Sequence, residues 1–128
     1  MTDFYNSAYS FMRISRIMEL VDLFKVLSNP VRLRSLNLLA QRFPDSLCVC
    51  DFMELLDCSQ SMISRHFKQL RDLNLVTTEQ KDQWVHYRLN KDMPDNRWSL
   101  LLTCLQQAAE ESPYDEDIMR LKKLKEHC

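Results

Sequence analysis

The sequence of 128 residues contains no glycine, so a turn that needs a left-handed residue must use asparagine or aspartate instead. The absence also excludes the glycine-rich loops that cradle the phosphates of ATP or of a dinucleotide. No stretch approaches 18 consecutive apolar residues, and the N-terminus lacks the basic start and apolar run of a signal peptide. We therefore expect a cytoplasmic protein with no organic cofactor and no membrane partner.

The sequence also has no excess of charge of either sign, since 17 Lys and Arg face 18 Asp and Glu for a net charge of −1. A protein that binds nucleic acid with this composition must gather its basic residues locally. Residues 59–88 do so weakly, with five basic against three acidic side chains. Because one chain could neutralise only a few phosphates, DNA binding would favour a dimer.

Five cysteines in a chain expected in the cytoplasm are typical of thiols, metal ligands or redox groups rather than of a disulfide framework. Two of them, Cys48 and Cys50, are separated by a single residue. Taken alone, such a pair has two interpretations, either a pair of ligands or one buried and one incidental thiol.

Apolar residues spaced three and four apart predict four helices before residue 74. These helices are expected over residues 13–27, 31–42, 49–56 and 59–73. Asn29 is expected to cap the second helix, with Pro30 at its first position. Asn74 is a plausible left-handed helix end in place of glycine. The inward side of the fourth helix is expected to carry Met62, Ile63, Phe67, Leu70 and Leu73.

Two segments rich in β-branched and aromatic residues follow, Leu75–Thr78 and Trp84–Leu89, with a polar tip at 79–83. A linker at 90–96 leads to an apolar helix at 98–109 and a charged helix at 116–127. The helix at 98–109 is apolar nearly all round, so we expect a second protomer to cover it.

Two short helices joined by a tight turn, with a polar and basic second helix and a following hairpin, predict a winged helix. The fold class is mostly α, an α+β winged helix in which a helix-turn-helix and a two-stranded β-wing are flanked by N- and C-terminal dimerisation helices. We expect one domain over residues 1–128, divided into a loose arm at 1–12, helices at 13–42, the helix-turn-helix at 47–73, the wing at 75–89 and dimerisation and C-terminal helices at 97–127.

Three motifs in this order resemble the arsenic-sensing members of the ArsR family of metal-responsive repressors. They are LCVCDF at residues 47–52, SQSMISRH at 59–66 and WVHYRL at 84–89. The opening of the second helix, SNPVRLR at 28–34, is also similar, and the resemblance covers roughly residues 13–109. It implies a homodimeric repressor that binds double-stranded operator DNA, an inverted repeat, and leaves it when a metalloid binds.

The resemblance assigns Cys48 and Cys50 as ligands of trivalent arsenic or antimony, for which soft thiolates are the natural donors. Residues two apart on a regular helix lie about 200° apart around its axis, so sharing one ion would require a distorted helix start. The family's third cysteine is replaced by Met53, which leaves Cys58 and Cys128 as open alternatives. Cys58 would lie about 12 Å further along a helix and is interpreted as a surface residue, and Cys104 as a packing residue.

Recognition helices present their first turns to base edges in the major groove. We therefore expect base contacts from Gln60, Ser61, Ser64 and Arg65, and phosphate contacts from His66 and Lys68. Lys81 at the wing tip is the expected groove or backbone contact. Arg32 and Arg34 have two open roles, in salt bridges or on phosphates, and His86 is interpreted as a packed strand residue.

Three further functions are set against this one, and the first is a winged helix that binds only protein, which the absence of salt-dependent DNA binding would indicate. On the same fold, the thiols could serve a redox or reactive-sulfur sensor. An enzyme is not expected, because the sequence lacks a Cys-x-x-Cys pair and a serine–histidine–aspartate constellation around either thiol.

Overall fold

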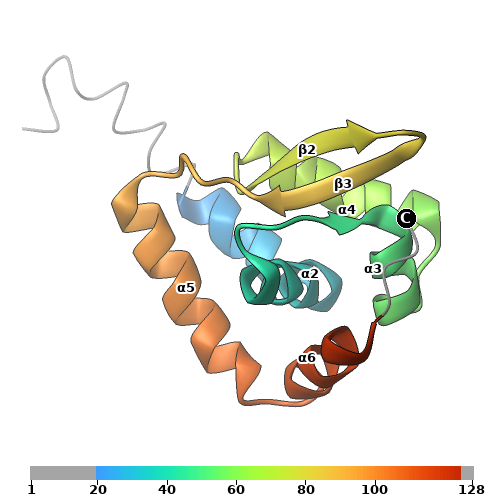
Figure 1. Ribbon diagram of the computed structural model, residues 1–128. Coiled ribbons are helices and arrows are strands. Elements are labelled where there is room, and N and C mark those ends of the chain that lie inside the picture. Colours follow the sequence, from blue (N-terminus) through green and yellow to red (C-terminus); the bar gives the residue numbers. More distant parts are fainter. Residues whose placement is uncertain (1–19, 125–128) are drawn as a thin grey trace, which may run out of the picture.

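The computed structural model describes residues 20–124, and Figure 1 shows their arrangement. Residues 20–27 are helical, and the elements that follow are α2 (Pro30–Arg42), β1 (Leu47–Cys48), α3 (Val49–Leu56), α4 (Gln60–Asp72), β2 (Val76–Lys81), β3 (Trp84–Leu89), α5 (Asp95–Ala109) and α6 (Tyr114–Lys123). The expected arm at 1–12 and the start of the expected helix at 13–27 lie outside the described residues.

The helix-turn-helix and the wing are present as predicted, and aspartate and asparagine take the left-handed positions that glycine usually fills. Asp57 (φ 53°) ends α3, Asn74 (φ 59°) follows α4, and Asp82 (φ 56°) forms the tip of the wing. Short polar side chains tolerate this region better than other residues. The expectation for Asn74 is therefore confirmed.

The sheet has three strands in the order β1-β3-β2, one more than the predicted two-stranded wing. The added strand β1 pairs antiparallel with β3, with Leu47 opposite Tyr87 and Cys48 opposite His86. The wing tip is also shorter than predicted, because β2 continues to Lys81 and only Asp82 and Gln83 remain between the strands. A two-residue strand is too short to produce an alternating pattern of apolar and polar residues, so the sequence does not predict it.

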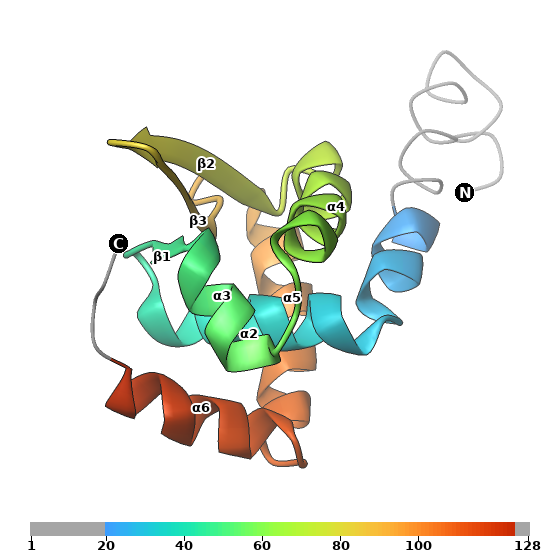
Figure 2. The same cartoon turned by 90° about the vertical axis from the view of Figure 1, so that its right-hand side faces the viewer.

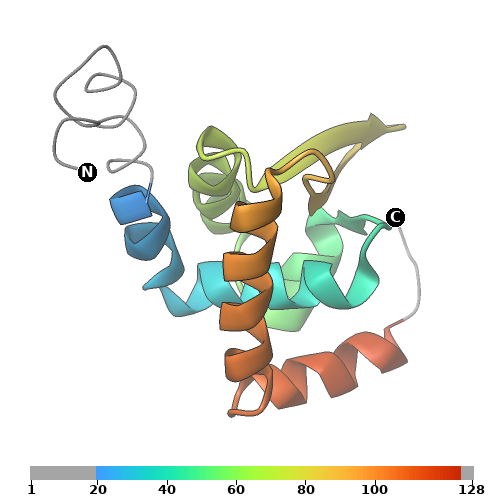
Figure 3. The same ribbon diagram turned by 90° about the vertical axis from the view of Figure 1, so that its left-hand side faces the viewer.

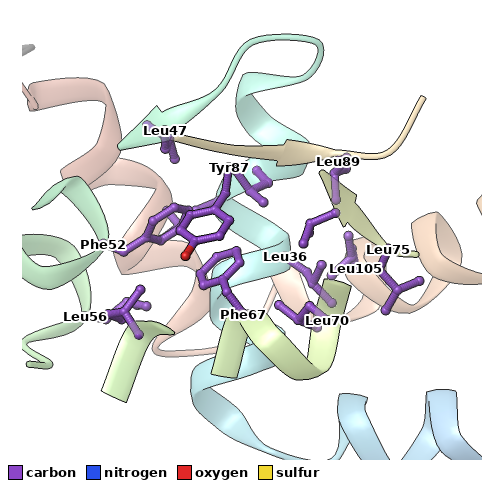
Figure 4. Close-up of a cluster of buried hydrophobic side chains, with 14 of the residues drawn as sticks. Leu36, Leu47, Phe52, Leu56, Phe67, Leu70, Leu75, Tyr87, Leu89 and Leu105 are labelled. Atoms are coloured by element: carbon purple, nitrogen blue, oxygen red, sulfur yellow. The ribbon is translucent and has the colours of Figure 1, made fainter. Parts of the chain in front are cut away.

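An aromatic cluster joins the two helices of the helix-turn-helix to the wing (Figure 4). The ring centroids of Phe52 on α3 and Phe67 on α4 are 4.7 Å apart, and Tyr87 on β3 stacks on Phe67 at 4.0 Å. All three side chains are buried. Burial of this size stabilises each ring by about 2–3 kcal/mol, so the cluster fixes α3, α4 and β3 relative to one another.

Helix α2 runs through the middle of the molecule, and α5 and α6 pack against it (Figures 1 and 2). Asn29 caps α2 as predicted, since its Oδ1 accepts from the amides of Val31 and Arg32, and Pro30 is its first residue. Helix α6 begins at Tyr114 and ends at Lys123, earlier at both ends than predicted.

Helix α5 differs from the prediction of a helix that is apolar nearly all round. It begins at Asp95, inside the expected linker, and buries one face through Leu101, Leu105 and Ala108. Its other side is largely polar, with exposed Ser99, Thr103, Gln106 and Gln107. Leu102 is 38% exposed. The folded chain therefore covers most of the apolar surface of α5 by itself, and that surface alone does not require a second protomer.

Candidate metal centre and nucleic-acid interface

The thiol pair lies where the sheet meets the helix-turn-helix. Cys48 is the last residue of β1 and the N-cap of α3, with extended backbone angles (φ −76°, ψ 152°), and Cys50 is already helical. Their Sγ atoms are 3.0 Å apart. The expectation that a shared ion requires a distorted helix is therefore wrong. Cys48 precedes the first helical residue, so the 200° separation of residues two apart on a helix does not apply to this pair.

Cys48 caps α3 in the way that serine or threonine usually does. Its Sγ accepts from the backbone amide of Cys50 at 3.4 Å, and its own amide donates to Oδ2 of Asp51 at 2.9 Å. The exchange closes a capping box at the start of α3. The same sulfur atom thus has a structural role in the helix and a position beside a second sulfur.

The pair suits a small thiophilic ion. Two sulfur atoms 3.0 Å apart can both bind one ion, since metal–thiolate bonds are about 2.3 Å long in zinc sites. Cys48 is fully buried and Cys50 is half-buried, so an ion would be reached from the Cys50 side. Within residues 20–124, no three His, Cys, Asp or Glu side chains are grouped so that they could hold a metal ion.

The other cysteines of the described range lie away from this pair. Cys58 follows the opposite end of α3, where its Sγ donates to the carbonyl of Leu56 at 3.4 Å. It is half-buried rather than on the surface as predicted, and burial raises the pKa of its thiol while Arg34 opposes the rise. Cys104 packs against the core from α5, as expected. Cys128 lies outside the described residues.

The expected DNA-reading surface is a face of α4 together with the wing tip. The side chains of Gln60, Ser61, Ser64, Arg65 and Lys68 are exposed on α4, and that of Lys81 is exposed beside the tip. Ser59 caps α4 by accepting from the amide of Met62. Met62 is 37% exposed, so its predicted inward position is wrong, and it joins the outer face. His66 is half-buried at the edge of this face.

Arg34 belongs to a salt bridge inside the protein, one of the two roles left open for it. It forms a bidentate pair with Asp117 of α6, with both N–O distances 2.8 Å, and Arg120 also contacts Asp117 at 2.7 Å. The Asp117 side chain is completely buried. Its hydrogen bond raises the pKa of Arg34 further, so Arg34 stays charged, and the pair fixes α6 on α2.

Arg32 forms no salt bridge among residues 20–124, the first of the two roles left open for it. Its guanidinium donates to backbone carbonyls of residues 25 and 26 and lies against the imidazole of His66 on α4. The sequence gives only a weak indication of the contact between Arg32 and His66, which is the presence of an arginine at the third position of a helix. His86 is buried, with Nδ1 3.5 Å from Oγ of Ser46, which confirms a packed strand residue.

Comparisons with known proteins agree with this fold. The family model described as "Bacterial regulatory protein, arsR family" matches residues 29–78. The "Arsenic resistance transcriptional regulator ArsR2" of Pseudomonas putida is 38% identical over 103 residues, which cover 80% of this chain and 86% of the relative.

Two solved structures share the fold. The homodimeric winged helix-turn-helix domain of Mb0332 from Mycobacterium bovis has a TM-score of 0.61 at 21% identity, covering 79% of this chain and 87% of that one. The AntR antimony-specific transcriptional repressor has a TM-score of 0.56 at 27% identity, covering 76% and 86%.

These features define a winged helix-turn-helix regulator of transcription that binds DNA. The chain belongs to the ArsR family. Its relatives are regulators rather than enzymes, in agreement with the sequence. Among residues 20–124, no helix is both long enough and apolar enough to cross a membrane.

Proposed function

We propose that this chain is a homodimeric repressor of an arsenic-resistance operon in the cytoplasm, which releases its operator when trivalent arsenic or antimony binds Cys48 and Cys50. The observation that carries the proposal is the 3.0 Å approach of the two sulfur atoms at the cap of the first helix of the helix-turn-helix. The names of the relatives, one for arsenic resistance and one specific for antimony, support the choice of ligand.

The switch follows from the double role of the Cys48 sulfur. In the free protein this atom accepts the Cys50 amide and completes the cap of α3. When bound, the metalloid would supply bonds to both thiolates and compete with that hydrogen bond for the Cys48 sulfur. Cys48 also lies in β1 opposite His86 of the wing. A change at this one residue therefore acts on both α3 and the wing.

The change reaches the reading helix through packed side chains. Phe52 follows Cys50 on α3 and contacts Phe67 on α4 with ring centroids 4.7 Å apart. A packed aromatic pair resists continuous deformation, so a shift of α3 moves α4 with it. Moving an operator equilibrium decisively takes about 5 kcal/mol of differential affinity, and metal–thiolate bonding is strong enough to supply it.

The proposed dimer would use apolar side chains that remain exposed around α5. Leu20, Val21 and Phe24 are 40%, 47% and 51% exposed on the helix at residues 20–27. Figure 3 shows this helix beside the start of α5. Phe43 (41% exposed) and Leu102 form a second apolar area with Trp98. A two-fold dimer would present two α4 helices to the half-sites of an inverted repeat.

A second function uses the same thiol pair. Two thiols whose sulfur atoms are 3.0 Å apart are also placed for oxidation, which supports a redox or reactive-sulfur sensor as the alternative. A gel-shift titration of operator DNA separates the two proposals. Release by arsenite in the presence of a reductant supports the metalloid sensor. Release only by an oxidant, reversed by a thiol, would support the alternative and contradict the first proposal.

A further inference from the structure

Arg32 lies between the helix at residues 20–27 and α4. It is the third residue of α2, and its guanidinium turns back toward the preceding helix. Nε donates to the carbonyl of Val26 at 2.8 Å, and Nη2 donates to the carbonyl of Lys25 at 3.3 Å. These carbonyls belong to the last turn of that helix, where positive charge is stabilising, and the Lys25 carbonyl also accepts from Oγ of Ser28 at 2.6 Å. One edge of Arg32 is therefore a cap for the N-terminal helix.

The other edge of the guanidinium contacts α4. Its Nη1 lies 3.2 Å from Nδ1 of His66. Because arginine has only donors, His66 must accept through Nδ1 and carry its proton on Nε2. The guanidinium stays charged at every physiological pH, so the contact favours the neutral imidazole. His66 is thereby fixed in one tautomer, with Nε2–H left as a donor.

The two edges together connect parts of the protein that have different tasks. The helix at residues 20–27 carries the exposed Leu20, Val21 and Phe24, and α4 carries the exposed polar face with Arg65 and Lys68. In a dimer, the tilt and separation of the two α4 helices must match the two half-sites. A side chain that ties α4 to the N-terminal helix restricts that tilt.

We propose that Arg32 is a positioning residue, which holds α4 against the N-terminal helix through His66 and so sets operator affinity without contacting DNA. The inference rests on the proposed role of α4 as the recognition helix. It assigns Arg32 a task different from the two considered from the sequence, because three of its five N–H donors are directed at two carbonyls and an imidazole inside the protein.

The first test measures operator affinity against salt concentration for Arg32→Ala and Arg32→Lys in the full-length protein. Losing a charged hydrogen bond predicts a roughly tenfold weaker affinity for Arg32→Ala. The slope of log affinity against log salt should stay at the wild-type value. Arg32→Lys should lose affinity as well, since one ammonium group cannot serve both edges. A slope reduced by about 1 in Arg32→Ala, with affinity retained in Arg32→Lys, would show a phosphate contact and overturn the proposal.

The second test approaches the same contact from α4, and it remains informative if Arg32→Ala does not fold. His66→Asn keeps an acceptor close to the position of Nδ1, whereas His66→Ala removes it. We expect His66→Asn to bind the operator more tightly than His66→Ala. The double variant Arg32→Ala/His66→Ala should be no weaker than the weaker single variant, because the two changes remove one contact. Additive losses would contradict the proposal.

Two controls separate this inference from the proposed function. Arg65→Ala and Lys68→Ala should weaken operator binding and reduce the salt slope. If neither does so, the role of α4 in reading DNA is wrong and the inference falls with it. If both do so while Arg32→Ala binds like the wild type, only the inference fails. Arsenic binding per protomer should be unchanged in the Arg32 variants, because the thiols lie on β1 and α3.

Discussion

The ring centroids of Phe52 and Phe67 are 4.7 Å apart, so the helix that begins at the thiol pair and the helix proposed to read DNA share a direct aromatic contact. Phe52 lies two residues after Cys50, within the same turn of α3. Both rings are fully buried, and Tyr87 of the wing completes the cluster. Under the proposed function, sensing and reading would therefore take place within one continuous core rather than in two separate domains.

Phe52→Leu should weaken the coupling between thiols and operator. The shorter side chain leaves a gap against Phe67, so α3 can shift without moving α4. We expect a stability loss of about 1–2 kcal/mol. The ratio of operator affinities without and with saturating arsenite should fall roughly tenfold. Leu105→Val on α5 is the control, with a comparable loss of stability and an unchanged ratio. Equal ratios for both variants would contradict the proposed route.

Asp117→Ala should be strongly destabilising, because it leaves the guanidinium of Arg34 without its bidentate partner. Removing one member of a buried pair costs about 3–5 kcal/mol. Since the side chain of Arg34 is 18% exposed, we expect the lower end of this range in urea unfolding. Asp72→Ala breaks the exposed Lys68–Asp72 pair and should cost less than about 1 kcal/mol. Similar costs for the two variants would show that α6 is not fixed through Asp117.

Stability should decrease at mildly acidic pH because of His66. Burial, followed by the charges of Arg32 and Arg65, lowers the pKa of His66 below its ordinary value of 6.5. The unfolded chain therefore takes up this proton before the folded protein does. As the pH falls below 6.5 toward the folded pKa, the unfolded state gains stability and the free energy of unfolding drops. Above pH 6.5 both states are neutral and the effect disappears.

The matched comparison for this pH effect is His66→Asn, which cannot titrate. Between pH 7.5 and roughly pH 5, the free energy of unfolding should fall more in the wild type than in His66→Asn. All other ionisable groups are the same in both proteins, so their contribution cancels in the difference. Parallel pH profiles would show that the contact between Arg32 and His66 does not favour the neutral imidazole.

Much of this fold is encoded in local signals. Asn29-Pro30 predicted the start of α2, and the apolar spacing predicted α3 and α4 to within about a residue. The left-handed Asn74 followed from the absence of glycine. Such features depend on neighbouring residues in the chain, so they can be predicted from the sequence.

The remaining features depend on tertiary contacts and could not be predicted. The pairing of β1 with β3 brings Cys48 opposite His86, a residue far away in the sequence. Cys48 is both paired in β1 and the cap of α3, and its Sγ lies 3.0 Å from that of Cys50. The contact of Arg32 with His66 likewise joins distant segments. A periodic pattern carries no information on either contact.

The most direct test of the central claim is a titration of the operator complex with arsenite under reducing conditions, using Cys48→Ser, Cys50→Ser and the control Cys58→Ser. The wild type and Cys58→Ser should release DNA at the same arsenite concentration. Cys48→Ser and Cys50→Ser should bind DNA normally, because serine keeps a cap acceptor at position 48, and should not release it. Release of either variant at the wild-type arsenite concentration would contradict the account.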